Sequence, residues 1–247
     1  HLQCTPSMAR MIAMNDEARH ALRDVQHLYF GGEPLPGALV REFAQITGAD
    51  VTNMYGPTET TIWSSTAAAA PGDGVVGLGI PIANTQLYVL DAARQPVGLG
   101  EDGELWIGGE GVTRGYWNRP ELTAERFADN PFHAGRMYRT GDLVRREAGG
   151  ALTFLGRVDH QIKLRGHRIE LGEIEAAMEA LDGLTQAVVS AQTMADGDVR
   201  LVGYYTGAVQ AEARLKAALS DRLPAIMVPG RMVWLEAFPL TPNKKVD

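Results

Sequence analysis

The stretch NMYGPTETTIW, residues 53–63, combines a turn with an unusual density of hydroxyl groups. Gly56 and Pro57 follow directly after Tyr55, and beyond them come three threonines and one carboxylate, Glu59. A Gly-Pro pair is typical of a turn, and these hydroxyls are more than a plain helix start needs. The stretch is therefore expected to hold a polar group.

The residues before and around this stretch have the pattern of alternating strands and helices. HLYFGGE, at 27–33, is typical of a strand that runs into a glycine loop. The apolar spacing of Leu39, Phe43 and Ile46 predicts a helix. VTNMYGPTE, at 51–59, repeats the plan of a strand followed by a turn, so the first 70 residues or so are expected to form α/β layers.

The rest of the chain changes character twice. From about residue 75 to 157, the strand-like runs QLYVLD, GELWIGG and LTFLGR are separated by Gly, Pro and Asp, which predicts a β-rich region. After residue 158 a helix is expected where Leu171, Ile174 and Met178 share a face, and a second helix near 211–222. Strands between and beyond these helices would complete a small α+β unit.

The composition is that of a globular, acidic chain. It has 247 residues, 45% of them apolar, a formal net charge of -7 and a pI near 5.4. This charge argues against a nucleic-acid partner, because no basic footprint for a phosphate backbone is present. A single cysteine, Cys4, excludes an internal disulfide, and no apolar run is long enough to span a membrane. A cytoplasmic location is expected, and the chain, which starts without methionine, is expected to be part of a longer protein.

Several motifs also have purely structural readings. GGEGVTRG, at 108–115, places three residues rather than two after its Gly-x-Gly, so it fails the dinucleotide pattern and favours turn and bulge glycines. His20 and His27 are seven residues apart and are more typical of surface or capping groups than of metal ligands. Taken alone, YGPTE and TGD are ordinary turn sequences. The basic run from Lys163 to Arg168 could be a solvated face.

Six motifs occur in one order along the whole chain. They are NMYGPTETT, GELWIGGEGVTRGYW, YRTGDL, GRVDHQIKLRGHRIELGEIE, LPAIMVP and NKKVD. Their order and spacing resemble the adenylation domains of non-ribosomal peptide synthetases. The resemblance implies ATP-dependent activation of an amino acid as its aminoacyl-adenylate. The product would then be transferred to the phosphopantetheine thiol of a carrier protein.

The same resemblance implies a fold and its division into domains. Residues 1–157 would be the C-terminal part of the large core of an adenylate-forming (ANL superfamily) enzyme, α/β to about residue 70 and β-rich from 75 to 157. Residues 158–247 would form a small, mobile α+β lid. In the family pattern Asp159 is the hinge, and Gly166 would let the pantetheine arm pass close to the backbone.

Eight residues match positions that contact ATP in this family: Gly31, Gly32, Glu33, Asn53, Tyr55, Asp142, Arg157 and Lys163. By this resemblance Tyr55 would stack on the adenine, Asn53 would bind its amino edge, and Asp142 would bind the ribose hydroxyls. The glycines of the loop would let the backbone approach the nucleotide closely.

Three residues match catalytic positions. Thr58 would bind phosphate oxygens, Glu59 would hold Mg²⁺, and Lys245 would bridge the substrate carboxylate and the phosphate oxygens. Because both reactants are anions, positioning and charge neutralisation dominate such a reaction. The opening stretch is thus expected to be an ATP-binding turn.

The family's substrate-pocket positions are also present in part. They are occupied by Gln3, Tyr29, Gly31, Met54, Ile62, Trp63 and Lys245. The indole of Trp63 would fill the volume that a substrate side chain needs. The set resembles that of glycine-activating domains, with Tyr29 where an aliphatic residue is more usual, so glycine is the predicted substrate and alanine the second choice.

Some features of the family are altered or missing. Lys244 stands where glycine is usual, and Ile226 stands where tyrosine is common. The phosphate loop and the aspartate that pairs with the substrate ammonium lie upstream of residue 1 in the family, so the chain alone is expected to be inactive. A condensation domain is expected upstream and a carrier domain downstream. Two alternatives stay open: an acyl- or aryl-CoA ligase, and a non-catalytic module that binds nucleotide or carrier protein.

Overall fold

The computed structural model describes residues 1–159, 161–194 and 199–239. The chain divides into two compact units, His1–Asp159 and His160–Asp247. Lys244 and Lys245 lie outside the described residues. In the described part no helix is long and apolar enough to cross a membrane.

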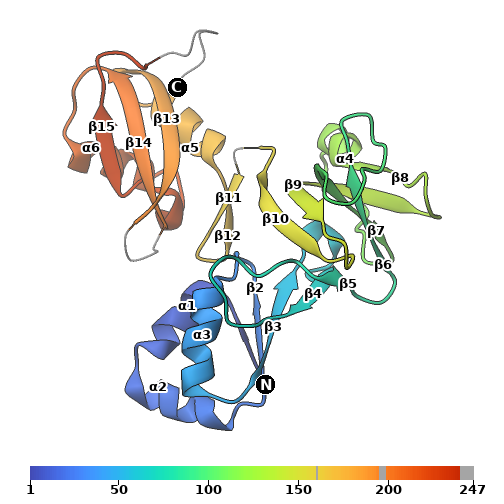
Figure 1. Ribbon diagram of the computed structural model, residues 1–247. Coiled ribbons are helices and arrows are strands. Elements are labelled where there is room, and N and C mark those ends of the chain that lie inside the picture. The colour runs from blue at the N-terminus through green and yellow to red at the C-terminus, as the bar shows by residue number, and fades with distance from the viewer. Residues whose placement is uncertain (160, 195–198, 240–247) are drawn as a thin grey trace. The chain divides into compact units, whose positions relative to one another are not determined.

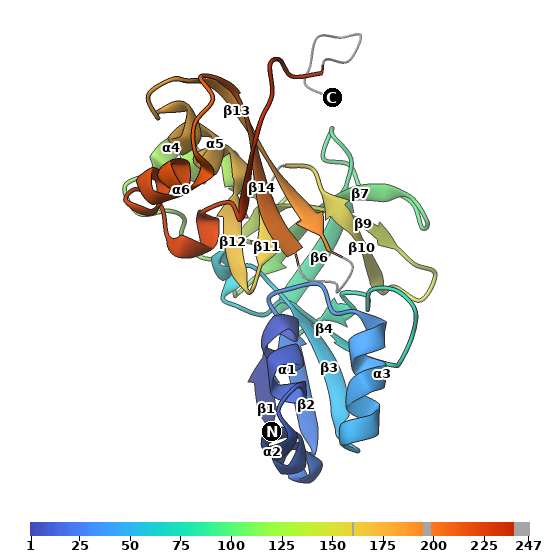
Figure 2. The same cartoon turned by 90° about the vertical axis from the view of Figure 1, so that its left-hand side faces the viewer.

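The first unit begins with an α/β layer. Its sheet has the order β1 (Leu2–Cys4), β2 (His27–Gly31), β3 (Asp50–Tyr55), β4 (Ser65–Ala68) and β5 (Ile80–Pro81). The pairs among β1, β2 and β3 are parallel, and β4 and β5 are antiparallel. The helical segments are α1 (Pro6–Ala13), α2 (Asp16–Ala21), the short 3₁₀ turn η1 (Leu22–Asp24) and α3 (Gly37–Ile46). Figures 1 and 2 show the three α-helices beside strands β1–β3.

Local sequence explains where these helices begin and which face they bury. The Thr5 side chain accepts a hydrogen bond from the Met8 amide, and proline follows it at the first helical position of α1. The rings of Phe30 in β2 and Phe43 in α3 meet edge to face, 5.2 Å apart between centroids, in the core between sheet and helices. The predicted α/β layers are thereby confirmed.

A second, antiparallel sheet follows in the same unit (Figure 1). Its order is β10 (Leu152–Arg157), β9 (Arg136–Arg146), β7 (Asp102–Gly109) and β6 (Thr85–Leu90), and β8 (Phe127–Asp129) also pairs with β9. Helix α4 (Pro120–Arg126) precedes β8, and the 3₁₀ turn η2 (Thr58–Thr60) follows β3. Tyr55, at the end of β3, packs with Leu105, Ile107 and Val144 of this second sheet. The β-rich middle region is therefore as predicted, and its core reaches the end of the first sheet.

The second unit has the predicted α+β composition. Its elements are the hairpin β11 (Gln161–Leu164) and β12 (His167–Glu170), α5 (Leu171–Glu179), β13 (Leu184–Thr193), β14 (Val199–Gly207), α6 (Glu212–Ser220), the 3₁₀ turn η3 (Ala225–Met227) and β15 (Arg231–Trp234). Strands β13 and β14 are antiparallel, and β15 is parallel to β14. Ile174 and Met178 of α5 and Leu215 and Leu219 of α6 contribute to one apolar core. That this unit acts as a mobile lid remains a prediction.

Candidate functional site

A buried polar network joins the two sheets of the first unit. The Tyr55 hydroxyl donates to Oδ2 of Asp142 on β9, and Nη1 of Arg157 donates to Oδ1 of the same carboxylate at 2.5 Å. Arg157 can reach because it lies directly opposite Asp142 in the β9–β10 pairing. Asp142 is only 4% exposed, so its charge is held by the guanidinium and the phenol rather than by water.

The environment of Tyr55 keeps its hydroxyl protonated. Burial raises the pKa of Tyr55 well above the usual value, and the neighbouring Asp142 carboxylate raises it further. A protonated phenol donates its hydrogen bond to the carboxylate, which is the arrangement found.

A glycine in TGD makes room for this network. Gly141 has φ +76°, and a Cβ there would lie 2.6 Å from Oδ2 of Asp159 and 2.7 Å from Nη2 of Arg157. The Arg157 guanidinium also forms a bidentate ion pair with Asp159, in which Nε donates to Oδ1 at 2.6 Å and Nη2 donates to Oδ2 at 2.8 Å. The residue predicted as the hinge is therefore tied by an ion pair to the end of strand β10.

The turn after β3 has an uncommon backbone. Thr61 and Ile62 have φ of +62° and +74°, and the Trp63 amide donates to the Thr61 carbonyl at 2.9 Å. This hydrogen bond from residue 63 to residue 61, with φ of +74° at the central residue Ile62, defines a γ-turn. A γ-turn with positive φ is rare, and it is strained for a β-branched residue. The turn leaves Thr58 exposed and buries Glu59.

The glycine-rich run after β7 holds this turn in place. Thr113 donates its amide to the Glu59 carbonyl at 2.9 Å, and Thr61 Oγ1 donates to the Gly111 carbonyl at 2.7 Å. The Tyr116 hydroxyl donates to Oε1 of Glu59 at 2.5 Å. A Cβ on Gly111 would lie 2.8 Å from the Thr60 carbonyl oxygen, so glycine is needed for this close approach. The run thus has the structural role that its spacing predicts.

The face of the first sheet opposite its helices carries the predicted pocket residues. Gln3 is in register with Tyr29, and Gly31 is in register with Met54, so these four side-chain positions share one face. The Trp63 indole packs directly against Gly31. A Cβ atom on Gly31 would lie only 2.4 Å from Trp63 Cη2, so no larger residue fits at this position without a shift. Ile62 is 60% exposed.

Two comparisons of the sequence with those of known proteins identify the family of this chain. The pattern of the "AMP-binding enzyme" family matches residues 1–117. The dimodular nonribosomal peptide synthase of Bacillus subtilis (strain 168) is 45% identical over 250 residues, which cover 100% of this chain and 10% of that protein. The chain belongs to the AMP-binding enzyme family.

Two solved structures of the family's peptide-synthetase branch match over nearly the full chain. An NRPS protein containing adenylation and PCP domains, bound to a vinylsulfonamide inhibitor, is 29% identical with a TM-score of 0.86, covering 99% of this chain and 43% of that one. A four-domain nonribosomal peptide synthetase, bound to AMP and glycine, is 46% identical with a TM-score of 0.58, covering 100% of this chain and 18% of that one. The chain is therefore a partial adenylation domain, and it spans less than half the length of these relatives.

Within this partial domain, two of the residues predicted to lie beside the adenine, Asn53 and Glu33, each have one hydrogen-bond acceptor that no described residue satisfies. Asn53 is 3% exposed and donates Nδ2 to the Gly77 carbonyl at 2.9 Å. Glu33 Oε2 accepts from the amide and the hydroxyl of Ser7 at 2.9 and 2.7 Å. Asn53 Oδ1 and Glu33 Oε1 are buried and have no hydrogen-bond partner among the described residues. Gly32, between these segments, has φ +86° and is partly exposed in the loop after β2.

The remaining predicted residues belong to the second unit. Lys163 is on β11, and Gly166 follows Arg165 in the turn between β11 and β12. Both turn residues have positive φ, +50° and +80°, as a type I′ hairpin turn requires. Lys245 lies outside the described residues, so its bridging role stays a prediction.

The sequence did not reveal Tyr116, the partner of Glu59. The two residues are 57 positions apart, and nothing in GYW signals a partner so distant. Within residues 1–159, 161–194 and 199–239, no group of three or more His, Cys, Asp or Glu side chains is placed to hold a metal ion.

Proposed function

We propose that this chain is the C-terminal part of an adenylation domain that activates an amino acid with ATP and loads it onto a carrier protein. The observation that carries the proposal is the Tyr55–Asp142–Arg157 network beside the turn of Glu59. It brings together three of the residues that match ATP-contacting positions, from strands far apart in the sequence.

The unpartnered acceptors fit an adenine. Asn53 Oδ1 is a buried acceptor, and the exocyclic amino group of adenine is a donor. An adenine ring would supply the hydrogen bond that this oxygen lacks. Tyr55 is 5% exposed, so stacking of the base on its ring would require neighbouring side chains to shift.

Asp142 is suited to the ribose. A carboxylate has about four lone-pair sites, and Tyr55 and Arg157 each take one of them. Ribose hydroxyls can donate to the remaining sites, and Arg157 keeps the carboxylate ionised and oriented. Glu59 would supply one oxygen ligand to Mg²⁺, which when bound would neutralise charge on the triphosphate. Exposed Thr58 would donate to phosphate oxygens from the same turn.

Glycine is the substrate that the pocket wall favours. Trp63 packs over Gly31 and occupies the space that the side chain of a larger amino-acid substrate would need. The four-domain synthetase structure that is 46% identical to this chain is described as bound to AMP and glycine. A methyl group forced against a packed wall costs about 1–3 kcal/mol, so we expect discrimination against alanine of roughly 10- to 200-fold.

A carrier protein is the proposed partner. One matched structure is of a protein that contains a PCP domain as well as an adenylation domain. The phosphopantetheine of such a carrier would receive the aminoacyl group, Gly166 would line its path, and Asp159 would be the hinge of the second unit. A condensation domain upstream and a cytoplasmic location belong to the same proposal.

Mass spectrometry of the carrier protein tests this function. The complete adenylation domain, ATP and an equimolar mixture of amino acids are incubated with the phosphopantetheinylated carrier, and the intact mass is measured. We expect a glycyl thioester that does not form without ATP. Absence of any aminoacyl adduct, or loading with a bulky amino acid, would contradict the proposal.

A further inference from the structure

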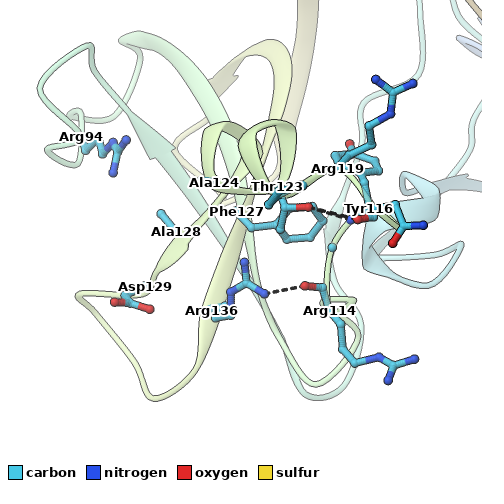
Figure 3. A pocket seen from close by; sticks show the side chains of 13 residues that line it. Arg94, Arg114, Tyr116, Arg119, Thr123, Ala124, Phe127, Ala128, Asp129 and Arg136 are labelled. Atoms are coloured by element: carbon cyan, nitrogen blue, oxygen red, sulfur yellow. Dashed lines mark hydrogen bonds between the residues drawn. The ribbon is translucent and has the colours of Figure 1, made fainter.

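A pocket of about 790 Å³ lies in the first unit (Figure 3), and neither Thr58 nor Glu59 is among its lining residues. Its walls come from the loop after β7, from α4, and from the ends of β8 and β9, with Arg94 at one side. Its size is in the range of small-molecule sites.

The lining is strongly basic although the whole chain is acidic. Arg94, Arg114, Arg119 and Arg136 line the pocket, and Asp129 is the one carboxylate among its lining residues, whereas the chain has a net charge of -7. Four guanidinium groups against one carboxylate leave an excess of three positive charges. Such a local excess attracts anions and raises their concentration in the pocket.

Two of the arginines are fixed by their contacts. The Arg136 guanidinium lies 5.1 Å from the ring centre of Phe127, and its Nη1 donates to the Arg114 carbonyl at 2.8 Å (Figure 3). The Arg94 guanidinium lies 5.2 Å from the ring centre of Trp106. A guanidinium group that stacks on an aromatic ring is held by its face. The N–H donors along its edge can then form hydrogen bonds with a ligand.

The other two arginines carry charge that the fold does not neutralise. Arg114 and Arg119 are exposed, and neither guanidinium forms an ion pair with any residue that the structure describes. Figure 3 shows them on either side of Tyr116, pointing outward. Each would rotate about its side-chain bonds to reach a bound molecule, a motion that exposed side chains make within nanoseconds.

We propose that this pocket binds a small molecule that carries a diphosphate or longer polyphosphate group. The excess of three charges calls for a ligand with several negative charges, which a single carboxylate lacks. Arginine forks match phosphate oxygens in bidentate geometry. Asn118, which also lines the pocket, adds a neutral donor. This site is distinct from the proposed ATP turn and does not depend on it, although Tyr116, whose hydroxyl binds Glu59, forms part of its wall.

Calorimetric titration of this 247-residue chain with inorganic pyrophosphate tests the proposal. We expect binding that Arg114→Gln and Arg119→Gln each weaken by about 10-fold or more, because each removes charge-assisted hydrogen bonds. Neither side chain supports the fold through an ion pair with the residues described, and circular dichroism checks that both variants are folded.

A control variant separates binding in this pocket from binding elsewhere on the chain. Arg19→Gln removes an exposed charge of α2 outside the pocket. This variant should bind pyrophosphate as the unmodified chain does. The proposal is overturned if the unmodified chain shows no binding at millimolar pyrophosphate, if Arg19→Gln weakens binding as much as the pocket variants, or if citrate binds equally well.

Discussion

Asp142 is the residue on which both sheets of the first unit converge. It accepts from Tyr55 at the end of one sheet and from Arg157 on the other, while almost fully buried. A carboxylate in this position is stable only while its donors are present, since an unsatisfied buried acceptor costs free energy.

Removal of the phenol from this network should destabilise the first unit. Tyr55→Phe should lower the free energy of unfolding by about 1–3 kcal/mol, because it leaves Oδ2 of Asp142 without that donor. Urea denaturation measures the change. Tyr29→Phe, in the same sheet, is the control, because its hydroxyl makes no hydrogen bond with the residues described. A loss no larger than that of the control would show that the contact contributes nothing.

The tyrosine pKa values predict an alkaline limit to stability. Burial raises the pKa of Tyr55 and of Tyr116 above the usual value of 10.0, and the neighbouring Asp142 or Glu59 raises each further. The stabilising effect of the neutral phenols is therefore complete below pH 10 and declines above it, because unfolding then releases their protons. Urea denaturation from pH 9 to 11 should show this decline. In an ultraviolet titration these two should ionise only on unfolding; if all seven tyrosines of the chain titrate together near pH 10 in the folded state, the prediction fails.

Trp63 provides a prediction about the substrate. In the complete domain, Trp63→Ser should open the space above Gly31 and raise activity with alanine relative to glycine by about 10-fold. Pyrophosphate exchange with each amino acid gives the ratio. Trp117→Ser, at an indole that is 89% exposed, should leave the ratio unchanged. An unaltered ratio in Trp63→Ser would show that the indole does not limit the pocket.

At the scale of elements, the turn between β3 and β4 shows which structural features sequence patterns can predict and which they cannot. The strand, the Gly-Pro turn and the polar character of the segment followed from residue types and spacing. The positive φ values at Thr61 and Ile62 did not, because neither residue type favours that region. Nor did the contacts with Gly111, Thr113 and Tyr116, since these depend on how distant segments pack.

The γ-turn predicts an unusual stabilising substitution. Ile62→Gly should raise the free energy of unfolding by about 0.5–1 kcal/mol, because glycine adopts φ +74° without the steric cost that a β-branched residue incurs. Ile80→Gly is the matched control: Ile80 is 59% exposed, close to the 60% of Ile62, but lies in strand β5, where glycine should destabilise. Thermal or urea denaturation of both variants checks the sign. Destabilisation by both would mean that the turn is not strained.

At the scale of the molecule, the α/β, β-rich and α+β order was predictable because the hydrophobic period changes along the chain. The six motifs added the family and the candidate residues. What the sequence lacked was the register that places Gln3, Tyr29, Gly31 and Met54 on one face, and the arginine pocket, whose members come from separate segments. Such features arise from pairing over long sequence separations, which local patterns do not encode.

The Tyr55–Asp142–Arg157 network is proposed to be part of an ATP site for amino-acid activation, and the whole function depends on that assignment. The most direct test is amino-acid-dependent exchange of labelled pyrophosphate into ATP by the complete domain, compared with Asp142→Asn and with the surface control Asp16→Asn on α2. We expect glycine to stimulate exchange and Asp142→Asn to raise the KM for ATP by about 10-fold or more, because a neutral amide binds hydroxyls less strongly than a carboxylate. Asp16→Asn should leave that KM unchanged. Exchange that no amino acid stimulates, or an Asp142→Asn domain with an unchanged KM for ATP, would contradict the account.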